Sequence, residues 1–114
     1  MASEPRLDLV HKAICTGTWG LIEWKPEALK LMLADPRMKG YTGAMVRHLV
    51  HEHVINGNSL RPRDQDKELW KTEQPWWYKA KIPVDDFPDG LFVEVILLDD
   101  DEECPSVQIV SAHP

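Results

Sequence analysis

The feature that most constrains the fold is a change in hydrophobic spacing near Gly57. Before this point, apolar residues recur every three or four positions, as they do along one side of an α-helix. After it they alternate with polar residues or run on continuously, as they do in β-strands. The sequence therefore predicts an α+β fold, in which N-terminal helices pack on one face of a three- or four-stranded antiparallel sheet. Its length of 114 residues predicts a single domain, residues 1–114.

Local signals divide the first half of the chain into three predicted helices. The first spans residues 3–17, with a serine as its N-cap and a glycine at its end. The second spans residues 26–35, because Pro26 suits a first turn and an Asp-Pro pair stops the helix. The third spans residues 42–56, with Thr42 as its N-cap.

The second half is predicted to form a meander of strands. The segments with strand spacing are residues 60–63, 76–82, 91–98 and 107–112. Pro62 favours an edge position for the first of these segments, because proline cannot donate to a central ladder. The third segment is almost wholly apolar, with Glu94 as its single charge, and is expected to be central. Residues 83–90 and 99–105 are expected to be turns, and residues 18–24 either a short strand or an extended connector.

One face of the predicted sheet brings cations together with a carboxylate. Arg61 and Arg63 share a face of the edge segment. Lys79 and Lys81 share a face of the next strand, and a suitable register places Glu94 between them. Phosphodiester cleavage needs cations that stabilise charge on a phosphate and a group that moves a proton, so this set suits that reaction. The alternative is a solvent-exposed sheet face with ordinary cross-strand ion pairs.

Histidines add two further candidates. His113 ends the last predicted strand, and its intrinsic pKa suits acid–base chemistry near neutrality, although a frayed terminus is the alternative. His48 and His51 share a helix face beside Glu52, but their spacing is not that of a helical zinc motif. We therefore expect no metal ion. No glycine-rich phosphate loop is present, and no cofactor is expected.

The charges are distributed unevenly along the chain. All 13 Lys and Arg lie in residues 1–81, together with 10 acidic residues, whereas residues 82–114 carry nine acidic residues and no Lys or Arg. An acidic protein gains nothing from long-range attraction to nucleic acid, although a local basic face can still bind it. The acidic third suits docking on a basic partner.

The chain carries no sign of export or membrane insertion. No apolar run approaches the roughly 18 residues of a membrane span, and the N-terminus lacks the pattern of a signal peptide. The two cysteines are far apart and are expected to be reduced thiols. We therefore expect a cytoplasmic protein without a membrane partner.

Several segments resemble the small ribonuclease toxins of the barnase–EndoU–colicin–RelE group, especially BrnT-like and RelE-like toxins. They are IEWKPEALKLML, GYTGAMVRHLVHEHVINGNSL, WWYKAKIPV, LFVEVILLDDD and VQIVSAHP, and the resemblance covers residues 19–113. It implies cleavage of RNA without a metal ion by Arg, Lys, His and Glu side chains of the sheet. The residues that fit these roles are Glu94, His113 and Lys81 as catalytic groups and Arg61, Arg63 and Lys79 as phosphate-binding groups.

Two functions follow as hypotheses. The first is a metal-independent endoribonuclease of toxin–antitoxin type, whose partners are RNA and a cognate antitoxin. The second is an acidic protein-binding module, such as an immunity protein, an antitoxin or a phage-encoded inhibitor, that docks on a basic protein. The charge on the open face of the sheet discriminates between them, because a positive cleft favours the nuclease and a negative surface favours the inhibitor.

Overall fold

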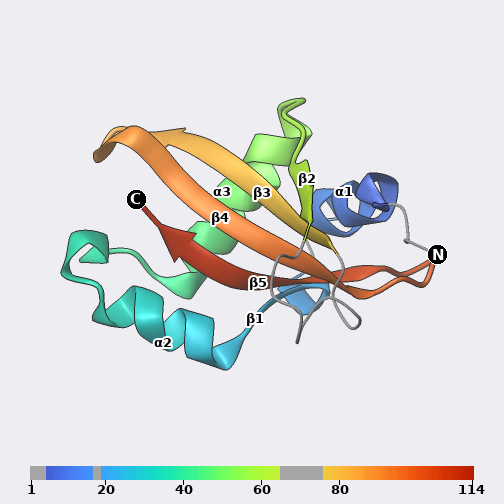
Figure 1. Ribbon diagram of the computed structural model, residues 1–114, viewed down its shortest axis with the longest axis horizontal. Helices are drawn as coiled ribbons and strands as arrows, with labels where there is room; N and C mark the ends of the chain where they lie inside the picture. Colours follow the sequence, from blue (N-terminus) through green and yellow to red (C-terminus); the bar gives the residue numbers. More distant parts are fainter. Residues whose placement is uncertain (1–4, 17–18, 65–75) are drawn as a thin grey trace.

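The computed structural model describes residues 5–16, 19–64 and 76–114, and it confirms the α+β class (Figure 1). The helices are α1 (Leu7–Cys15), α2 (Pro26–Ala34) and α3 (Gly43–Ile55), with short 3₁₀ turns η1 (Trp19–Leu21) and η2 (Pro36–Met38). The strands are β1 (Ile22–Trp24), β2 (Arg61–Asp64), β3 (Trp76–Val84), β4 (Phe87–Asp99) and β5 (Ser106–His113). The helices belong to the N-terminal half and the sheet is mostly antiparallel, as predicted.

The five strands form one sheet in the order β1-β5-β4-β3-β2. Strands β2 to β5 are antiparallel neighbours, whereas β1 runs parallel to β5, with Ile22 opposite Val107. The pairing continues past β1, because the Lys25 N–H donates to the Ile109 carbonyl at 2.9 Å. The sheet thus has one strand more than expected, since residues 22–24 join its edge instead of serving as a connector.

The helices cover one face of this sheet, and α3 passes behind β3 and β4 in Figure 1. Every second residue of β3 points toward the helices, so Tyr78, Ala80 and Ile82 are buried. Buried side chains of all three helices and of β1, β3, β4 and β5 make up a single apolar cluster. Burial of this cluster provides the main drive for folding, and it leaves the opposite side of the sheet available for polar residues.

The predicted helix starts can be compared with the capping groups. The Thr42 hydroxyl accepts a hydrogen bond from the Met45 N–H at 3.1 Å, and Pro26 occupies the first turn of α2, as predicted. Helix α1 begins at Leu7, later than expected, and the predicted cap Ser3 lies outside the described residues. No helix in the described ranges has the length and apolar character that a membrane crossing requires. Both cysteines are free thiols.

The hairpin between β3 and β4 is tighter than the eight-residue turn predicted from its prolines and aspartates. Strand β3 runs to Val84, and only Asp85 and Asp86 form the turn. The ladder shifts register between Ile82 and Val84, so the intervening proline sits where the regular pairing is interrupted. Opposite this bulge, Gly90 has a φ of +87°, and a Cβ there would lie 3.0 Å from the Ile82 carbonyl oxygen. Only glycine avoids both the strained φ and this contact.

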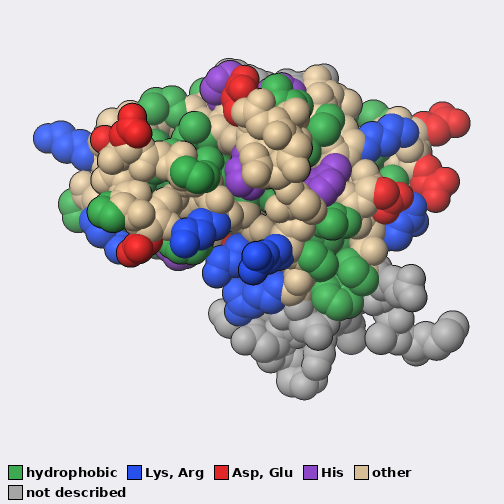
Figure 2. Space-filling view, turned by 90° about the horizontal axis from the view of Figure 1, so that it is seen from above, with side chains coloured by type: hydrophobic (Ala, Val, Ile, Leu, Met, Phe, Trp, Pro, Cys, Tyr) green, Lys and Arg blue, Asp and Glu red, His purple; other side chains and the backbone are tan. Residues whose placement is uncertain are grey.

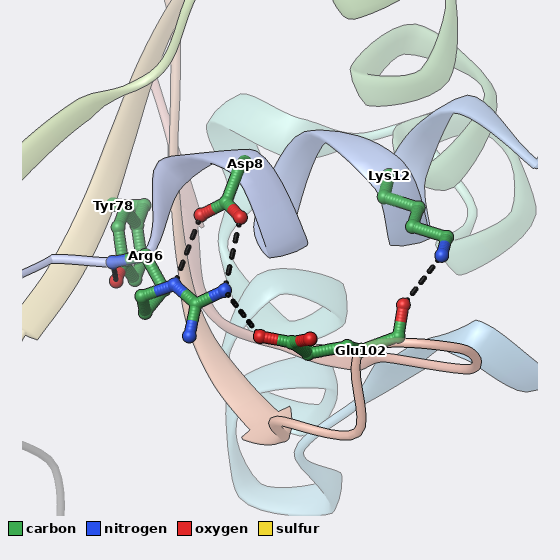
Figure 3. A network of polar contacts seen from close by, with 5 residues as sticks. All are labelled: Arg6, Asp8, Lys12, Tyr78 and Glu102. Atoms are coloured by element: carbon green, nitrogen blue, oxygen red, sulfur yellow. Dashed lines mark hydrogen bonds and ion pairs between the residues drawn. The ribbon is translucent and has the colours of Figure 1, made fainter.

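A polar network fastens the β4–β5 loop to α1 (Figure 3). Arg6 Nη2 lies 3.0 Å from Asp8 Oδ2 and 3.2 Å from Glu102 Oε1. Lys12 Nζ donates to the Glu102 carbonyl oxygen, and the Arg6 N–H donates to the Tyr78 hydroxyl at 2.9 Å. Hydrogen bonding to the guanidinium holds the pKa of Asp8 below its usual value. Part of the acidic loop is therefore neutralised within the chain itself.

Candidate functional site

The register of the sheet aligns three of the predicted site residues across neighbouring strands. Arg61 of β2 lies opposite Lys79 of β3, and Lys79 lies opposite Glu94 of β4. Glu94 in turn lies opposite Ser111 of β5. Lys79 belongs to the face that the helices leave open, because it alternates with the buried positions of β3, and the residues opposite it on neighbouring strands lie on the same face.

The second row of the open face is built around an aromatic ring. Phe92 of β4 lies between Lys81 of β3 and His113 of β5. The rings of Phe92 and His113 stack with centroids 5.7 Å apart and planes inclined by 23°. From the other side, Lys79 Nζ and Lys81 Nζ lie 5.1 and 5.8 Å from the centroid of the Phe92 ring. Cations over an aromatic face are attracted by its quadrupole, so the ring helps to hold the two ammonium groups together.

Arg63 and Glu94 form an ion pair on the same face. Arg63 Nη1 lies 3.3 Å from Glu94 Oε2, and the Glu94 side chain is only 10% exposed, against 47% for Arg63. A buried carboxylate is stabilised by such a partner. Glu94 is thus placed to orient Arg63 on this face.

A pocket of about 480 Å³ opens beside this row, at the edge of β3. Strand β2 begins at Arg61, so among the described residues no strand pairs with β3 on that edge beyond Lys79. The end of α3 and the loop after it reach the same place. The lining residues are Arg61, Lys79, Lys81 and Phe92 from the sheet and His53, Asn58 and Ser59 from α3 and its loop. Figure 2 looks at the molecule from the side of β2 and shows Lys and Arg side chains gathered near histidine side chains.

The lining of this basic pocket carries charge of one sign. Arg61, Lys79 and Lys81 contribute three cations, and no described Asp or Glu lines the pocket. Within residues 5–16, 19–64 and 76–114, none of the three cations forms an ion pair. Grouped cations in a concave site focus a positive potential, and an anion that enters replaces the missing partner. The pocket therefore suits a phosphate group.

His53 is the pocket residue that the sequence did not reveal as a site residue. Its side chain, in the last turn of α3, is half-buried and lines the pocket. Burial lowers the pKa of His53 below its ordinary value of 6.5, so the ring is neutral at pH 7 and can accept a proton.

The remaining histidine candidates have separate partners. His48 Nε2 lies 3.6 Å from Glu52 Oε1, and His51 Nδ1 lies 2.8 Å from the Ile14 carbonyl oxygen. In the part of the chain that the structure describes, no three His, Cys, Asp or Glu residues are grouped as a metal site would require. His48 and His51 thus have different polar partners, a carboxylate and a backbone carbonyl.

No family model, curated protein or solved structure matches this chain. The resemblance to ribonuclease toxins accordingly remains an expectation. The structure defines a class of site, a cationic pocket with an aromatic wall on an α+β fold. The function is inferred from this pocket alone.

Proposed function

We propose that this protein binds RNA in the basic pocket and cleaves it without a metal ion. One observation carries the proposal: three cations without ion-pair partners in the described chain share a cavity with a neutral imidazole. Cations of this kind bind phosphate and stabilise the negative charge that develops on it, and an imidazole accepts the proton that the nucleophile loses. The size of the cavity falls in the range of small-ligand sites, about 300–1,000 Å³.

The reaction that these groups can support is an internal transesterification. The ribose 2′-oxygen attacks phosphorus while His53 takes its proton, and the bond from phosphorus to the 5′-oxygen breaks. Lys81 and His113, which lie on either side of Phe92, are the groups that can return a proton to the leaving oxygen. The products are a 2′,3′-cyclic phosphate and a 5′-hydroxyl end. Arg61 holds the phosphate throughout.

The test is cleavage of RNA by the purified protein in the presence of EDTA. The wild type should release fragments with 2′,3′-cyclic phosphate ends. Lys81→Gln should slow cleavage by about 10²–10³-fold, the usual effect of removing one transition-state donor. Lys39→Gln is the matched control, because Lys39 is exposed and lies outside the pocket. Intact RNA after prolonged incubation with the wild type contradicts the proposal.

The second hypothesis, an acidic protein-binding module that docks on a basic protein, has less structural support. The exposed acidic loop, residues 99–103, is the surface that it would use. Glu102 of that loop is already engaged by Arg6 and Lys12 of the same chain. The open sheet face carries a positive pocket, which is the feature expected of the nuclease and not of the inhibitor.

A further inference from the structure

We propose that the basic pocket selects an unpaired nucleotide of an RNA strand, with the base stacked on Phe92 and the adjoining phosphate held by Arg61, Lys79 and Lys81. This inference rests on the proposed function, because it names the form of RNA that the same pocket takes. It goes further in assigning a role to the aromatic ring, which cleavage chemistry alone does not require.

The position of Phe92 is the first reason. A phenylalanine on the open face of a sheet has no core to fill, yet Phe92 occupies the centre of its row and forms a wall of the pocket. Its ring is only half-buried. An aromatic face that is reachable from a cationic cavity is what recognition of single-stranded nucleic acid uses, because every base has a face that can stack.

The lysines provide the second reason. Lys79 Nζ and Lys81 Nζ lie within 6 Å of the Phe92 centroid, so ring and ammonium groups are separated by less than the length of a nucleotide. When a phosphate arrives, the ammonium groups can turn from the ring to the anion, which is the stronger partner for a cation. The ring face that they leave is then free for the base attached to that phosphate.

His113 completes the arrangement on the other side of the ring. It stacks on Phe92 at a centroid distance of 5.7 Å and thereby supports the orientation of the ring. Duplex RNA keeps its bases stacked inside the helix and cannot offer a base to Phe92 without unpairing. The pocket should therefore bind a single strand better than a duplex of the same sequence.

The experiment compares three oligonucleotides that cannot be cleaved, because their 2′-oxygens are methylated. They are a single strand, its duplex, and an abasic strand that keeps every phosphate. In fluorescence anisotropy at fixed salt, the wild type should bind the single strand about 5- to 100-fold more tightly than the abasic strand, the range expected for stacking of one base. The duplex should bind no better than the abasic strand.

Variants then assign the difference to the ring. Phe92→Leu should lower affinity for the single strand to the level of the abasic strand, whereas Phe92→Tyr keeps the ring and the affinity. Phe87→Leu is the matched control, because the other phenylalanine of the chain stacks on Tyr41 outside the basic pocket. If Phe92→Leu does not fold, the affinities of the wild type for the three oligonucleotides still test whether a base contributes to binding.

The outcomes separate this inference from the function on which it rests. Equal binding of the abasic and complete strands, or full affinity in a folded Phe92→Leu protein, overturns the role of the ring. If the ring has no role but Lys79→Gln still weakens binding of both the complete and the abasic strand, the phosphate site is supported and only the stacking of a base on Phe92 is rejected. If neither Lys79→Gln nor Lys81→Gln weakens any strand, the proposed function fails too. If uridine monophosphate competes for the pocket with the same affinity as the single strand, the ligand is a free nucleotide and not RNA, and the assignment is overturned.

Discussion

The pocket residues come from two parts of the chain that are far apart in sequence. Lys79, Lys81 and Phe92 belong to one hairpin, whereas His53 belongs to the last turn of α3. The cations supply binding, and the imidazole supplies a site for a proton. The role of the imidazole depends on partial burial, since full burial would remove access and full exposure would leave the pKa of His53 at its ordinary value.

His53→Gln tests the division of these roles. RNA affinity should stay within about two- to threefold of the wild type, while cleavage should fall by about 10²–10⁴-fold, the usual contribution of general acid–base catalysis. Because burial lowers the pKa of His53, its neutral form persists to below pH 6.5, and the acid limb of the wild-type pH–rate profile should lie below that value. His48→Gln, at an exposed position of α3, is the control. Unchanged cleavage in His53→Gln assigns the proton transfer to another group.

The two tyrosines of the chain differ in how much their hydroxyl groups should contribute to stability. Tyr78 is buried and accepts the Arg6 N–H, so Tyr78→Phe leaves a backbone donor without its acceptor and should lower the free energy of unfolding by about 1–2 kcal/mol. The Tyr41 hydroxyl donates to Asp86 at 2.7 Å near the surface. Burial and this carboxylate raise the pKa of Tyr41 to about 12, which keeps the hydroxyl protonated.

Urea denaturation of the two variants provides the comparison. Tyr41→Phe should lower the free energy of unfolding less than Tyr78→Phe does, because water can take over as the partner of Asp86. The reverse order would show that the hydrogen bond from Arg6 contributes little to the attachment of α1.

At the scale of elements, signals close in sequence predicted structure well and pairings between distant segments were missed. Pro26 and Thr42 place the starts of α2 and α3, because proline geometry and a capping hydroxyl act within one turn. The parallel pairing of Ile22 with Val107 joins segments that are far apart in the chain, and no local sequence pattern near residue 22 predicts this partner.

The site follows the same rule. Arg61, Lys79 and Glu94 could be predicted to align, because alternation along strands and short connections set a cross-strand register. His53 could not be assigned to the pocket in this way, since its approach depends on the path of the loop that follows α3. In the sequence, Phe92 is one apolar residue within a continuous apolar strand. Its partial exposure on the open face follows from the strand register, which the sequence alone does not give.

The β3–β4 hairpin gives a direct test at this scale. Gly90→Ala should lower the free energy of unfolding by at least about 1 kcal/mol, because the residue has a positive φ and its new methyl group would meet the Ile82 carbonyl oxygen at 3.0 Å. Gly20→Ala has no such conflict, since no atom lies within 4 Å of its added Cβ. Thermal or urea unfolding should therefore separate the two variants clearly. Equal stability of Gly90→Ala and wild type would contradict the bulge described here.

At the scale of the whole molecule, the acidic third of the sequence does not become an acidic face. Apart from Glu94, which pairs with Arg63, its carboxylates lie in or beside the β3–β4 turn and in the β4–β5 loop, toward opposite ends of the 13-residue strand β4. Figure 2 shows acidic side chains toward both ends of the long axis. The basic pocket lies between them: along β4, Phe92 is three residues from Asp89 and seven from Asp99, roughly 10 and 24 Å at about 3.4 Å per residue. A net charge of −6 is thus compatible with local attraction of an anion.

Asp99, Asp100 and Asp101 test this separation of charges. Replacing all three with Asn keeps side-chain acceptors for the loop, where the Asp101 N–H donates to Asp99 Oδ1. RNA affinity should remain within about twofold of the wild type at 0.1 M salt, where charges more than about 10 Å apart are screened, and should rise a few-fold near 0.01 M. Loss of RNA binding, or loss of binding to a basic protein isolated with the wild type, would instead favour the docking module.

The salt dependence of RNA affinity tests the central claim most directly. If each of Arg61, Lys79 and Lys81 neutralises one phosphate, the logarithm of the association constant for a single strand should fall with the logarithm of salt concentration with a slope of about −2. Lys81→Gln should weaken binding and reduce the magnitude of the slope by about 0.7, and Lys39→Gln should leave both unchanged. An association constant that does not respond to salt, or that is the same in Lys81→Gln as in the wild type, would contradict binding of phosphate in the basic pocket.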